Sequence, residues 1–441
     1  MSNYKRDLIV VGAGIIGLTS AYYVKKDNPD LSVLVLEKEA THSQGNTGRS
    51  AAGYRDLFST EANFKLSHSS IEFYRHVQNN LGVNLEMKDV GYLFLMSQKK
   101  LERLKLQLRE VIKNTKVDIL DIDTLKQIPQ LNLDLDPSEA KTLSLDPIEV
   151  GVLGRNCGVL EIERLATFYY EECQKLGVEF RFHSEVKSLE LSPAEPLDYP
   201  GEPFLWQKKL IKSVILTDGS RLEADRFLIT TGAWTKKLLD PLGIDNHIRT
   251  KRRDVFQTSG EGIKKLVNSS YEFLNNQETI PFIVLPSHGI YLRPYPKAGA
   301  FWVTTSGTTS DQEVGNNFSY DLSDRVEEDS TARMDIFNYS IAPILKAYLK
   351  PYNEPFEVSG SWVGYYSLNT QDKAPYIFPA LNCIVATGGS GTGVMKADAI
   401  GRIVSGVFSN KNAISLYDGS KIKPSMFGVL DRDVGIEKLK F

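Results

Sequence analysis

The sequence predicts an α/β chain, α+β overall, in which a domain built on a parallel sheet carries a second, mainly antiparallel domain as an insertion. Short, continuously apolar and β-branched runs begin near residues 7, 32, 227 and 382. Such runs are typical of strands buried on both faces of a parallel sheet. The stretches between them alternate apolar and polar residues or have helical period. The parallel-sheet domain is therefore expected to be assembled from separated segments.

The boundaries of these parts follow from the positions of the apolar runs. We expect a first domain from residues 1–50, 150–245 and 378–415, a second domain from residues 51–149 and 246–377, and a C-terminal tail from residues 416–441. Helical period predicts helices near residues 18–26, 66–80, 101–113, 161–176, 325–349 and 396–408. Residues 248–257 carry four cations, and we interpret them as a strand with its charges at the outer end.

The composition is that of an ordinary globular protein. Of 441 residues, 52 are Lys or Arg and 55 are Asp or Glu, so the net charge of −3 gives no reason to expect nucleic-acid binding. The longest apolar run, residues 8–18, falls short of the roughly 18–20 residues that cross a bilayer. The cysteines and histidines show no metal-ligand spacing. We expect a cytoplasmic protein without a transmembrane segment, a nucleic-acid partner or a bound metal.

A glycine-rich turn, Gly12-Ala13-Gly14-Ile15-Ile16-Gly17, follows the first apolar run. In such a turn, Gly12 permits the tight bend, Gly14 lets a pyrophosphate approach the backbone, and Gly17 lets helix and strand pack closely. The helix N-terminus would present N–H groups and a positive dipole end to the phosphates. Glu37 closes the second apolar run, where a carboxylate accepts hydrogen bonds from ribose hydroxyls. This pattern predicts a Rossmann-type dinucleotide site; a tight βα turn without a ligand is the alternative.

The glycine turn alone fits NAD as well as FAD. It stands near the beginning of the sequence, and no second G-x-G-x-x-G is present for a nicotinamide cofactor. Both features favour FAD that the substrate reduces directly. A second glycine-rich turn, residues 388–393, precedes a predicted helix whose positive end would stabilise a reduced, anionic flavin. The small residues and two arginines of residues 47–55 suit a backbone that passes close to a ligand; an ordinary surface loop is the alternative.

With these glycine-rich turns and apolar runs, the chain resembles the FAD-dependent amine and amino-acid oxidoreductases of the D-amino-acid oxidase superfamily. That superfamily includes glycine oxidase, sarcosine oxidase and the dye-linked L-proline dehydrogenases. The resemblance covers residues 7 to about 408. The blocks that carry it are residues 12–17 with Glu37, residues 231–234, residues 362–364 with Asp372 and Pro375, and residues 388–393.

The resemblance implies a non-covalent FAD and a set of contacts to it. The loop at residues 47–55 would lie against the isoalloxazine, Val186 would meet the adenine, and residues 391–395 would cover the pyrimidine end of the flavin. Taken with the first glycine turn, the predicted FAD contacts are Gly12, Gly14, Ile15, Ile16, Gly17, Glu37, Lys38, Gly48, Arg49, Ser50, Ala51, Val186, Thr231, Gly232, Gly391, Thr392, Gly393, Val394 and Met395. The wall opposite the flavin would come from Tyr291, Arg293, Tyr365 and Tyr366.

Departures from the family pattern narrow the expected activity. The carboxylate-binding Arg that glycine oxidase and D-amino-acid oxidase place after Trp-x-Gly is absent, because the stretch reads Tyr365-Tyr366-Ser367. Residues 301–305 hold no Lys of the kind that activates oxygen in sarcosine oxidase. No Cys lies near Tyr365 for covalent flavin attachment. These absences favour a dehydrogenase with an external acceptor other than oxygen, of the L-proline dehydrogenase type.

The leading hypothesis is oxidation of the C–N bond of a small amino acid or secondary amine, with L-proline the best choice, by hydride transfer to flavin N5. Arg55 is the first choice for binding the substrate carboxylate and Arg293 the second. The alternatives are a surface salt bridge for Arg55, a structural pair inside the sheet for Arg293, and plain core positions for the tyrosines. Two other functions stay open: a 2-hydroxyacid dehydrogenase with His288 as base, and a flavin-bearing subunit or assembly factor without its own substrate.

Overall fold

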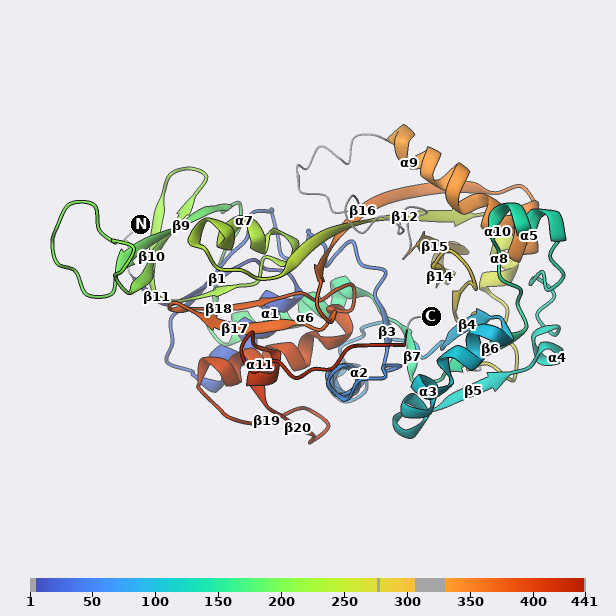
Figure 1. Ribbon diagram of the computed structural model, residues 1–441, viewed down its shortest axis with the longest axis horizontal. Coiled ribbons are helices and arrows are strands. Elements are labelled where there is room, and N and C mark those ends of the chain that lie inside the picture. Colours follow the sequence, from blue (N-terminus) through green and yellow to red (C-terminus); the bar gives the residue numbers. More distant parts are fainter. Residues whose placement is uncertain (1–4, 276–277, 306–329, 440–441) are drawn as a thin grey trace.

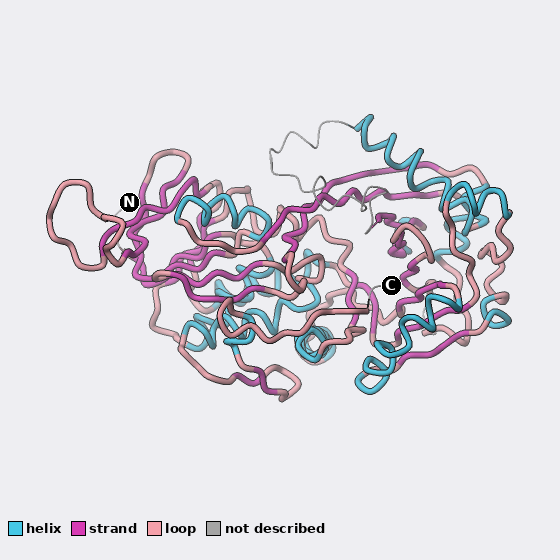
Figure 2. The backbone as a smooth tube through the Cα atoms, viewed as in Figure 1, coloured by secondary structure: helices cyan, strands magenta, loops and turns pink. Residues whose placement is uncertain are grey.

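Two large sheets lie toward opposite ends of the molecule's long axis (Figure 1). The computed structural model describes residues 5–275, 278–305 and 330–439, and each of these sheets has eight strands within that part of the chain. Figure 2 shows helices along the lower face of the sheet on the left and a further helical layer above the sheet on the right. The predicted α/β class, with one parallel and one mainly antiparallel sheet, is confirmed.

The first sheet is parallel at its centre and holds the four strands predicted from the apolar runs. β1 pairs in parallel with β2 on one side and with β11 on the other, and β11 pairs in parallel with β18. The hairpin strands β9 and β10 extend it beside β11. Its strands are β1 (Arg6–Val11), β2 (Val33–Leu36), β8 (Glu179–Arg181), β9 (Val186–Pro193), β10 (Lys209–Leu216), β11 (Arg221–Ile229), β17 (Tyr376–Ala380) and β18 (Cys383–Thr387).

The second sheet runs in the order β16-β12-β15-β14-β13-β4-β6-β5 and is antiparallel except where β13 meets β4. Its strands are β4 (Tyr92–Met96), β5 (Val117–Leu120), β6 (Val150–Gly154), β12 (Ile248–Ser259), β13 (Phe282–Val284), β14 (Ile290–Tyr295), β15 (Ala300–Thr305) and β16 (Glu357–Asn369). Two small ribbons complete the strands: β3 (Gly53–Arg55) with β7 (Cys157–Val159), and β19 (Ile414–Ser415) with β20 (Lys421–Ile422).

Helices flank both sheets (Figure 2). They are α1 (Ile15–Asp27), α2 (Glu61–Asn79), α3 (Gln98–Asn114), α4 (Ile122–Leu125), α5 (Pro137–Leu143), α6 (Ile162–Lys175), α7 (Thr235–Leu239), α8 (Glu261–Val267), α9 (Ser330–Ile336), α10 (Ala342–Tyr348) and α11 (Ala397–Phe408). The predicted helix over residues 325–349 is divided into α9 and α10 by a π-turn, and residues 325–329 lie outside the described part. Among the described residues, no helix has the length and apolar character needed to cross a membrane.

Three of the expected domain boundaries are wrong. β6 pairs with β4 and β5, so residues 150–154 belong to the second sheet and not to the first domain. β17 begins at Tyr376, two residues before the expected boundary at 378, and already belongs to the first sheet. Helix α2 packs into the core of the first domain, where Leu66 and Tyr74 are fully buried with Leu8 and Val10. The reason is general: the local pattern of a strand or helix does not specify its partner.

Candidate active site

A cavity of about 820 Å³ lies between the two sheets. On one side it meets the carboxyl ends of β1, β2, β11 and β18, through residues such as Val11, Glu37, Thr230 and Thr387. On the other side it meets the face of the second sheet. Ligands of open α/β sheets bind at the carboxyl ends of the parallel strands, so this cavity is where the fold places a cofactor.

The first glycine turn has the geometry that its sequence predicts. Gly12 has φ +101°, a conformation that L side chains rarely adopt. A Cβ on Gly17 would lie 1.9 Å from the carbonyl oxygen of Gly12, so only glycine allows this contact between helix and turn. Gly14 is the N-cap of α1 and has no capping side chain, which leaves the helix N-terminus open toward the cavity.

Glu37 lies at the cavity and also closes the glycine turn. Its Oε2 accepts a hydrogen bond from the Ala13 N–H (2.8 Å), and its Oε1 accepts one from the Glu39 N–H (3.1 Å). The carboxylate is therefore held in place by the backbone on both sides. A contact between Glu37 and ribose hydroxyls stays a prediction.

The second glycine turn borders the same cavity from the end of β18. Gly388 and Gly391 both have positive φ, +75° and +81°. A Cβ on Gly391 would lie 2.4 Å from the Tyr366 ring, so this turn packs directly on β16. The Ser390 hydroxyl accepts a hydrogen bond from the Asn369 N–H and donates one to the Gly388 carbonyl, both at 3.0 Å.

Most of the predicted FAD contacts line the cavity. They are Gly12, Gly14, Ile15, Ile16, Glu37, Lys38, Arg49, Ser50, Ala51, Val186, Thr231, Gly232, Gly391, Thr392, Gly393, Val394 and Met395. Gly17 and Gly48 do not line it. A Cβ on Gly48 would lie 2.7 Å from the Ser43 carbonyl oxygen, so both glycines shape turns behind the cavity wall.

The residues present fit FAD. The open N-terminus of α1 suits a pyrophosphate, and the cavity reaches from Val186 in the first sheet to Tyr291 in the second. The buried hydroxyls of Ser43 and Thr304 line the cavity and have no hydrogen-bond partner within the described residues. Buried polar groups are normally paired, so these two hydroxyls are donors or acceptors ready for a bound ligand.

Two cations that line the cavity lie close to the same aromatic ring. The Arg55 guanidinium, on β3, lies 4.3 Å from the centre of the Phe58 ring, and the Lys396 ammonium lies 4.4 Å from the same centre. Lys396 is only 1 % exposed and donates to Asn63 Oδ1 and Thr392 Oγ1, both at 2.8 Å. Its burial, with the charge of Arg55, lowers the pKa of Lys396 to about 7. The site therefore presents a fixed and a titratable positive charge, and the Glu437 carboxylate lies near both: it acts to raise the pKa of Lys396, and Arg55 acts to lower the pKa of Glu437.

Lys396 was not among the predicted site residues, although the sequence carries a signal for it. It directly follows Gly391–Met395, a stretch that was already predicted to touch the flavin, and precedes the apolar helix α11. Both segments are expected to be buried. A lysine between them is therefore expected to be buried too, next to the ligand that they cover. Only its charge, which is unusual in that position, could have marked it as functional.

The interpretation of the charges on β12 is wrong for two residues. Lys251 and Arg253 line the cavity, and the Arg253 guanidinium lies 5.1 Å from the centre of the Tyr366 ring. Successive side chains of a strand point to opposite faces, so Lys251 and Arg253 share the face of β12 that meets the cavity, while Arg252 pairs with Asp254.

An aromatic wall faces the parallel-sheet domain. Tyr92 stacks on Phe282 with ring centres 4.1 Å apart, and Phe282 stacks on Tyr291 at 5.5 Å. The Tyr291 and Tyr366 hydroxyls are 3.2 Å apart, and Tyr365 lines the cavity beside them. Burial raises the pKa of both Tyr92 and Tyr291, so their phenols are neutral at physiological pH.

Two expected site residues lie outside the cavity. Arg293 is 2 % exposed and donates to the carbonyl oxygens of Ala51 (3.1 Å) and Leu160 (3.2 Å) and to Glu161 Oε1 (3.3 Å). Its Nε and Nη2 are thus engaged inside the protein and the residue does not line the cavity, which corrects the expectation that it binds a substrate carboxylate. His288 Nε2 lies 2.7 Å from the Leu143 carbonyl oxygen and does not line the cavity either.

The C-terminal tail reaches the site, which its sequence did not reveal. Glu437 and Leu439 line the cavity, and Leu439 is buried. The Glu437 carboxylate accepts hydrogen bonds from the N–H groups of Ser59 (3.0 Å) and Thr60 (3.3 Å), just before α2 begins. In Figure 1 the red end of the chain correspondingly returns to the region between β3 and β4.

Comparison with known proteins agrees with this geometry. The family model for FAD dependent oxidoreductases (DAO) matches residues 7–406. The chain is 26 % identical to FAD-dependent oxidoreductase domain-containing protein 1 of Xenopus laevis, over 93 % of this chain and 81 % of that one, and 25 % identical to human peroxisomal sarcosine oxidase, over 56 % of each. The structure of L-proline dehydrogenase from P. horikoshii superposes with a TM-score of 0.67 at 21 % identity, covering 97 % of both chains. The chain belongs to the FAD-dependent oxidoreductase family.

Proposed function

We propose that this FAD-dependent oxidoreductase oxidises the C–N bond of a small amino acid or secondary amine that carries a carboxylate. The observation that carries the proposal is the pair of cations, Arg55 and Lys396, which both line the cavity and lie against the same Phe58 ring. A carboxylate is the group that such a pair recognises, because charge-assisted hydrogen bonds to it are short and strong. L-proline is the first candidate substrate, with an acceptor other than oxygen.

Each residue has a defined task in this proposal. Arg55 binds the carboxylate as a fixed cation, and Lys396 adds a second hydrogen bond in its protonated form. Because the free Lys396 has a pKa of about 7, an arriving carboxylate stabilises the ammonium and draws a proton onto Nζ. Tyr291 and Tyr366 close the opposite wall and exclude water. When bound, FAD supplies the hydride acceptor; positioning by the protein supplies most of the rate.

The choice of substrate class has independent support. The structural neighbour from P. horikoshii is an L-proline dehydrogenase and the human relative is a sarcosine oxidase, and both names denote oxidation of secondary amino acids. The rival 2-hydroxyacid function loses its expected base, because His288 lies outside the cavity. The aromatic wall formed by Tyr92, Phe282 and Tyr291 favours an apolar substituent over a second charge.

An anaerobic titration of the FAD-loaded protein tests the proposal. We expect L-proline to bleach the visible flavin band, and we expect the band to return slowly in air if oxygen is not the natural acceptor. Sarcosine, D-amino acids and 2-hydroxyacids follow in the same cuvette. Bleaching by 2-hydroxyacids alone would contradict the proposal. If none of the compounds bleached the flavin band, the result would favour a subunit or assembly factor without its own substrate.

A further inference from the structure

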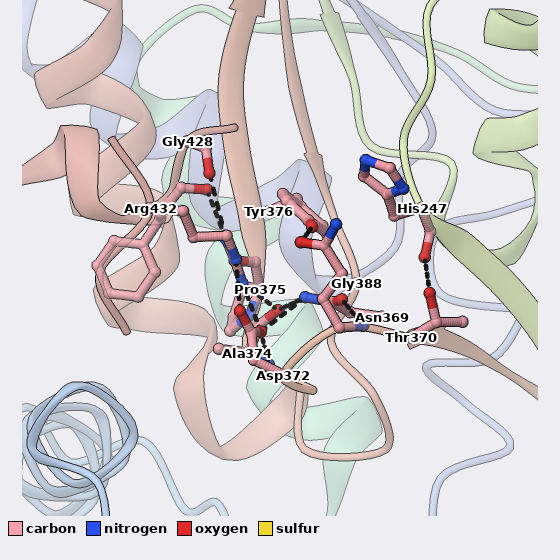
Figure 3. A network of polar contacts seen from close by, with 12 residues as sticks. His247, Asn369, Thr370, Asp372, Ala374, Pro375, Tyr376, Gly388, Gly428 and Arg432 are labelled. Carbon is pink, nitrogen blue, oxygen red and sulfur yellow. Dashed lines mark hydrogen bonds and ion pairs between the residues drawn. The ribbon is translucent and has the colours of Figure 1, made fainter. Parts of the chain in front are cut away.

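A buried ion pair joins the C-terminal tail to the loop that follows β16 (Figure 3). Arg432 Nε donates to Asp372 Oδ2 at 2.6 Å, and Nη2 donates to Oδ1 of the same carboxylate at 2.7 Å. Both side chains are only about a tenth exposed. Bidentate geometry of this kind is specific to arginine and sets the orientation of both partners.

The rest of the Arg432 guanidinium is also engaged. Nη1 donates to the carbonyl oxygens of Pro375 (3.2 Å) and Phe427 (3.0 Å), and Nη2 donates to that of Ala374 (3.1 Å). Its Cζ atom lies 4.0 Å from the centre of the Tyr376 ring. Arg432 thus binds the loop before β17 on one side and its own tail on the other, and a lysine could not make these contacts.

From Asp372 the hydrogen bonds continue to the second glycine turn. Asn369 Nδ2 donates to Asp372 Oδ1 (2.9 Å) and to the Ala374 carbonyl oxygen (2.7 Å), while the Asn369 N–H donates to Ser390 Oγ (3.0 Å). Asn369 is completely buried. Ser390 has φ +47° and lies in the turn over residues 388–393, which lines the cavity. A continuous chain of contacts therefore links the tail to this turn.

We infer that Arg432 is a positioning residue of the FAD site and that the C-terminal segment, residues 428–439, is an integral part of that site. Without Arg432, Asp372 would be a buried carboxylate without its counter-charge, and the loop over residues 369–375 would move toward water. Ser390 would lose its fixed partner, and the glycine turn would lose its shape. The inference rests on FAD binding by this family and is independent of the amine substrate.

Coupling of this kind works in both directions. If the anchored tail holds the turn in the shape that binds FAD, then bound FAD must stabilise the anchor by the same free energy. The tail is thus expected to exchange its amide hydrogens more slowly when FAD is bound, although no direct contact between Arg432 and the cavity is needed.

Variants at Arg432 test the inference through the affinity for FAD, measured by flavin fluorescence with the full chain. We expect Arg432→Met to weaken FAD binding at least tenfold and to change the visible spectrum of the bound flavin, with Arg432→Lys in between. Lys423→Met is the matched control, because Lys423 is an exposed cation just before this segment and does not line the cavity. FAD affinity and spectrum of Arg432→Met that match the wild type would overturn the inference.

Hydrogen exchange of the unmodified protein provides a second test that does not depend on folding of a variant. We compare the FAD-free and FAD-loaded forms, with helix α3 as the internal control because none of its residues lines the cavity. Slower exchange over residues 369–375 and 428–433 on addition of FAD is the expected result. Protection of the turn over residues 388–393 without any change at residues 428–433 would overturn the coupling. Because neither test uses a substrate, both remain decisive even if proline oxidation fails.

Discussion

The two ends of the cavity are built in different ways. At the cofactor end, the single continuous segment from β1 to Glu37 supplies strand, turn, helix N-terminus and carboxylate. At the substrate end, Arg55, Arg253 and Lys396 come from three distant segments that only tertiary packing brings together. The cofactor end is therefore a local structure whose function depends on close steric fit. The substrate end is assembled from distant segments, and its function depends on charge and on the relative position of the two sheets.

The same contrast holds for the glycines and charges that matter at each end. Gly17 touches the backbone of its own turn, so any side chain there collides with an atom that has nowhere to move. Lys396 instead sits among Asn63, Thr392 and Phe58, whose side chains are able to adjust. We therefore expect steep, all-or-none effects at the cofactor end and graded, pH-dependent effects at the substrate end.

The largest effect should come from Gly17→Val. Its Cβ would begin 1.9 Å from the Gly12 carbonyl oxygen, so strand and helix would be forced apart and the phosphate turn destroyed. We expect FAD affinity to fall about 100-fold or more, a loss of roughly 3 kcal/mol. Equilibrium binding followed by flavin fluorescence measures it.

Gly360→Ala is the control for this substitution, because the nearest atom to a Cβ there is 3.9 Å away and Gly360 does not line the cavity. We expect its FAD affinity to equal that of the wild type. Retention of tight FAD binding by Gly17→Val would show that the cofactor end is more adaptable than its geometry indicates.

The next-largest effect distinguishes Arg55, which lines the cavity, from Arg293, which is buried outside it. With tetrahydrofuran-2-carboxylate, a proline analogue that cannot be oxidised at a C–N bond, we expect Arg55→Met to bind about 30-fold more weakly, a loss of about 2 kcal/mol. Arg293→Met should lower the melting temperature instead, because it leaves Glu161 and two carbonyl groups without their donor. Equal ligand affinities for Arg55→Met and the wild type would show that Arg55 does not bind the carboxylate.

A third effect is the pH dependence of the same ligand. Lys396 has a lowered pKa of about 7, so in the free protein it loses its charge as the pH rises above that value. Since only the ammonium attracts a carboxylate, affinity for the analogue should fall by up to about tenfold per pH unit above pH 7. Titrations between pH 6 and 9 measure this slope, and Lys396→Met should abolish it. A slope that persists in Lys396→Met would assign the titration to another group.

The smallest effect concerns the hydrogen bond between His68 and Asp56, the residue that follows Arg55 in the sequence. The buried Asp56 carboxylate lies 3.0 Å from His68 Nδ1, and this hydrogen bond raises the pKa of His68. Because the folded pKa is raised, the stabilisation is fully present below pH 6.5 and is lost as the pH rises through the folded value. We expect His68→Gln to cost about 1 kcal/mol at pH 6 and much less at pH 8.5. Urea unfolding at the two pH values checks this. An equal loss of unfolding free energy at both pH values would show that the charge of His68 does not contribute to stability.

The sequence predicted those features that are local. The strands β1, β2, β11 and β18 could be recognised because each is a continuous apolar run, and Gly12 and Gly17 could be placed because the turn between strand and helix has a fixed spacing. The dinucleotide site followed from the same turn, and the family model for FAD dependent oxidoreductases agrees with it. Each of these inferences needs only the residues of one segment.

Features that depend on packing could not be predicted. Nothing in the neighbourhood of Arg293 distinguishes it from Arg55, yet one is enclosed by backbone carbonyls and the other faces the cavity. The inward direction of Arg253 depends on how β12 pairs with β16, and Glu437 lies at the site because it accepts hydrogen bonds from Ser59 and Thr60, far away in the sequence. Contacts between residues hundreds of positions apart have no local signature.

The most direct test of the central claim compares L-proline with pyrrolidine, the same ring without its carboxylate. The rate of anaerobic flavin reduction is measured for both compounds with the wild type and with the double variant Arg55→Met and Lys396→Met. We expect the wild type to prefer L-proline strongly at low concentration and the double variant to lose most of that preference while it still binds FAD. An undiminished preference in the double variant, or equal rates for both compounds with the wild type, would contradict recognition of the substrate through its carboxylate.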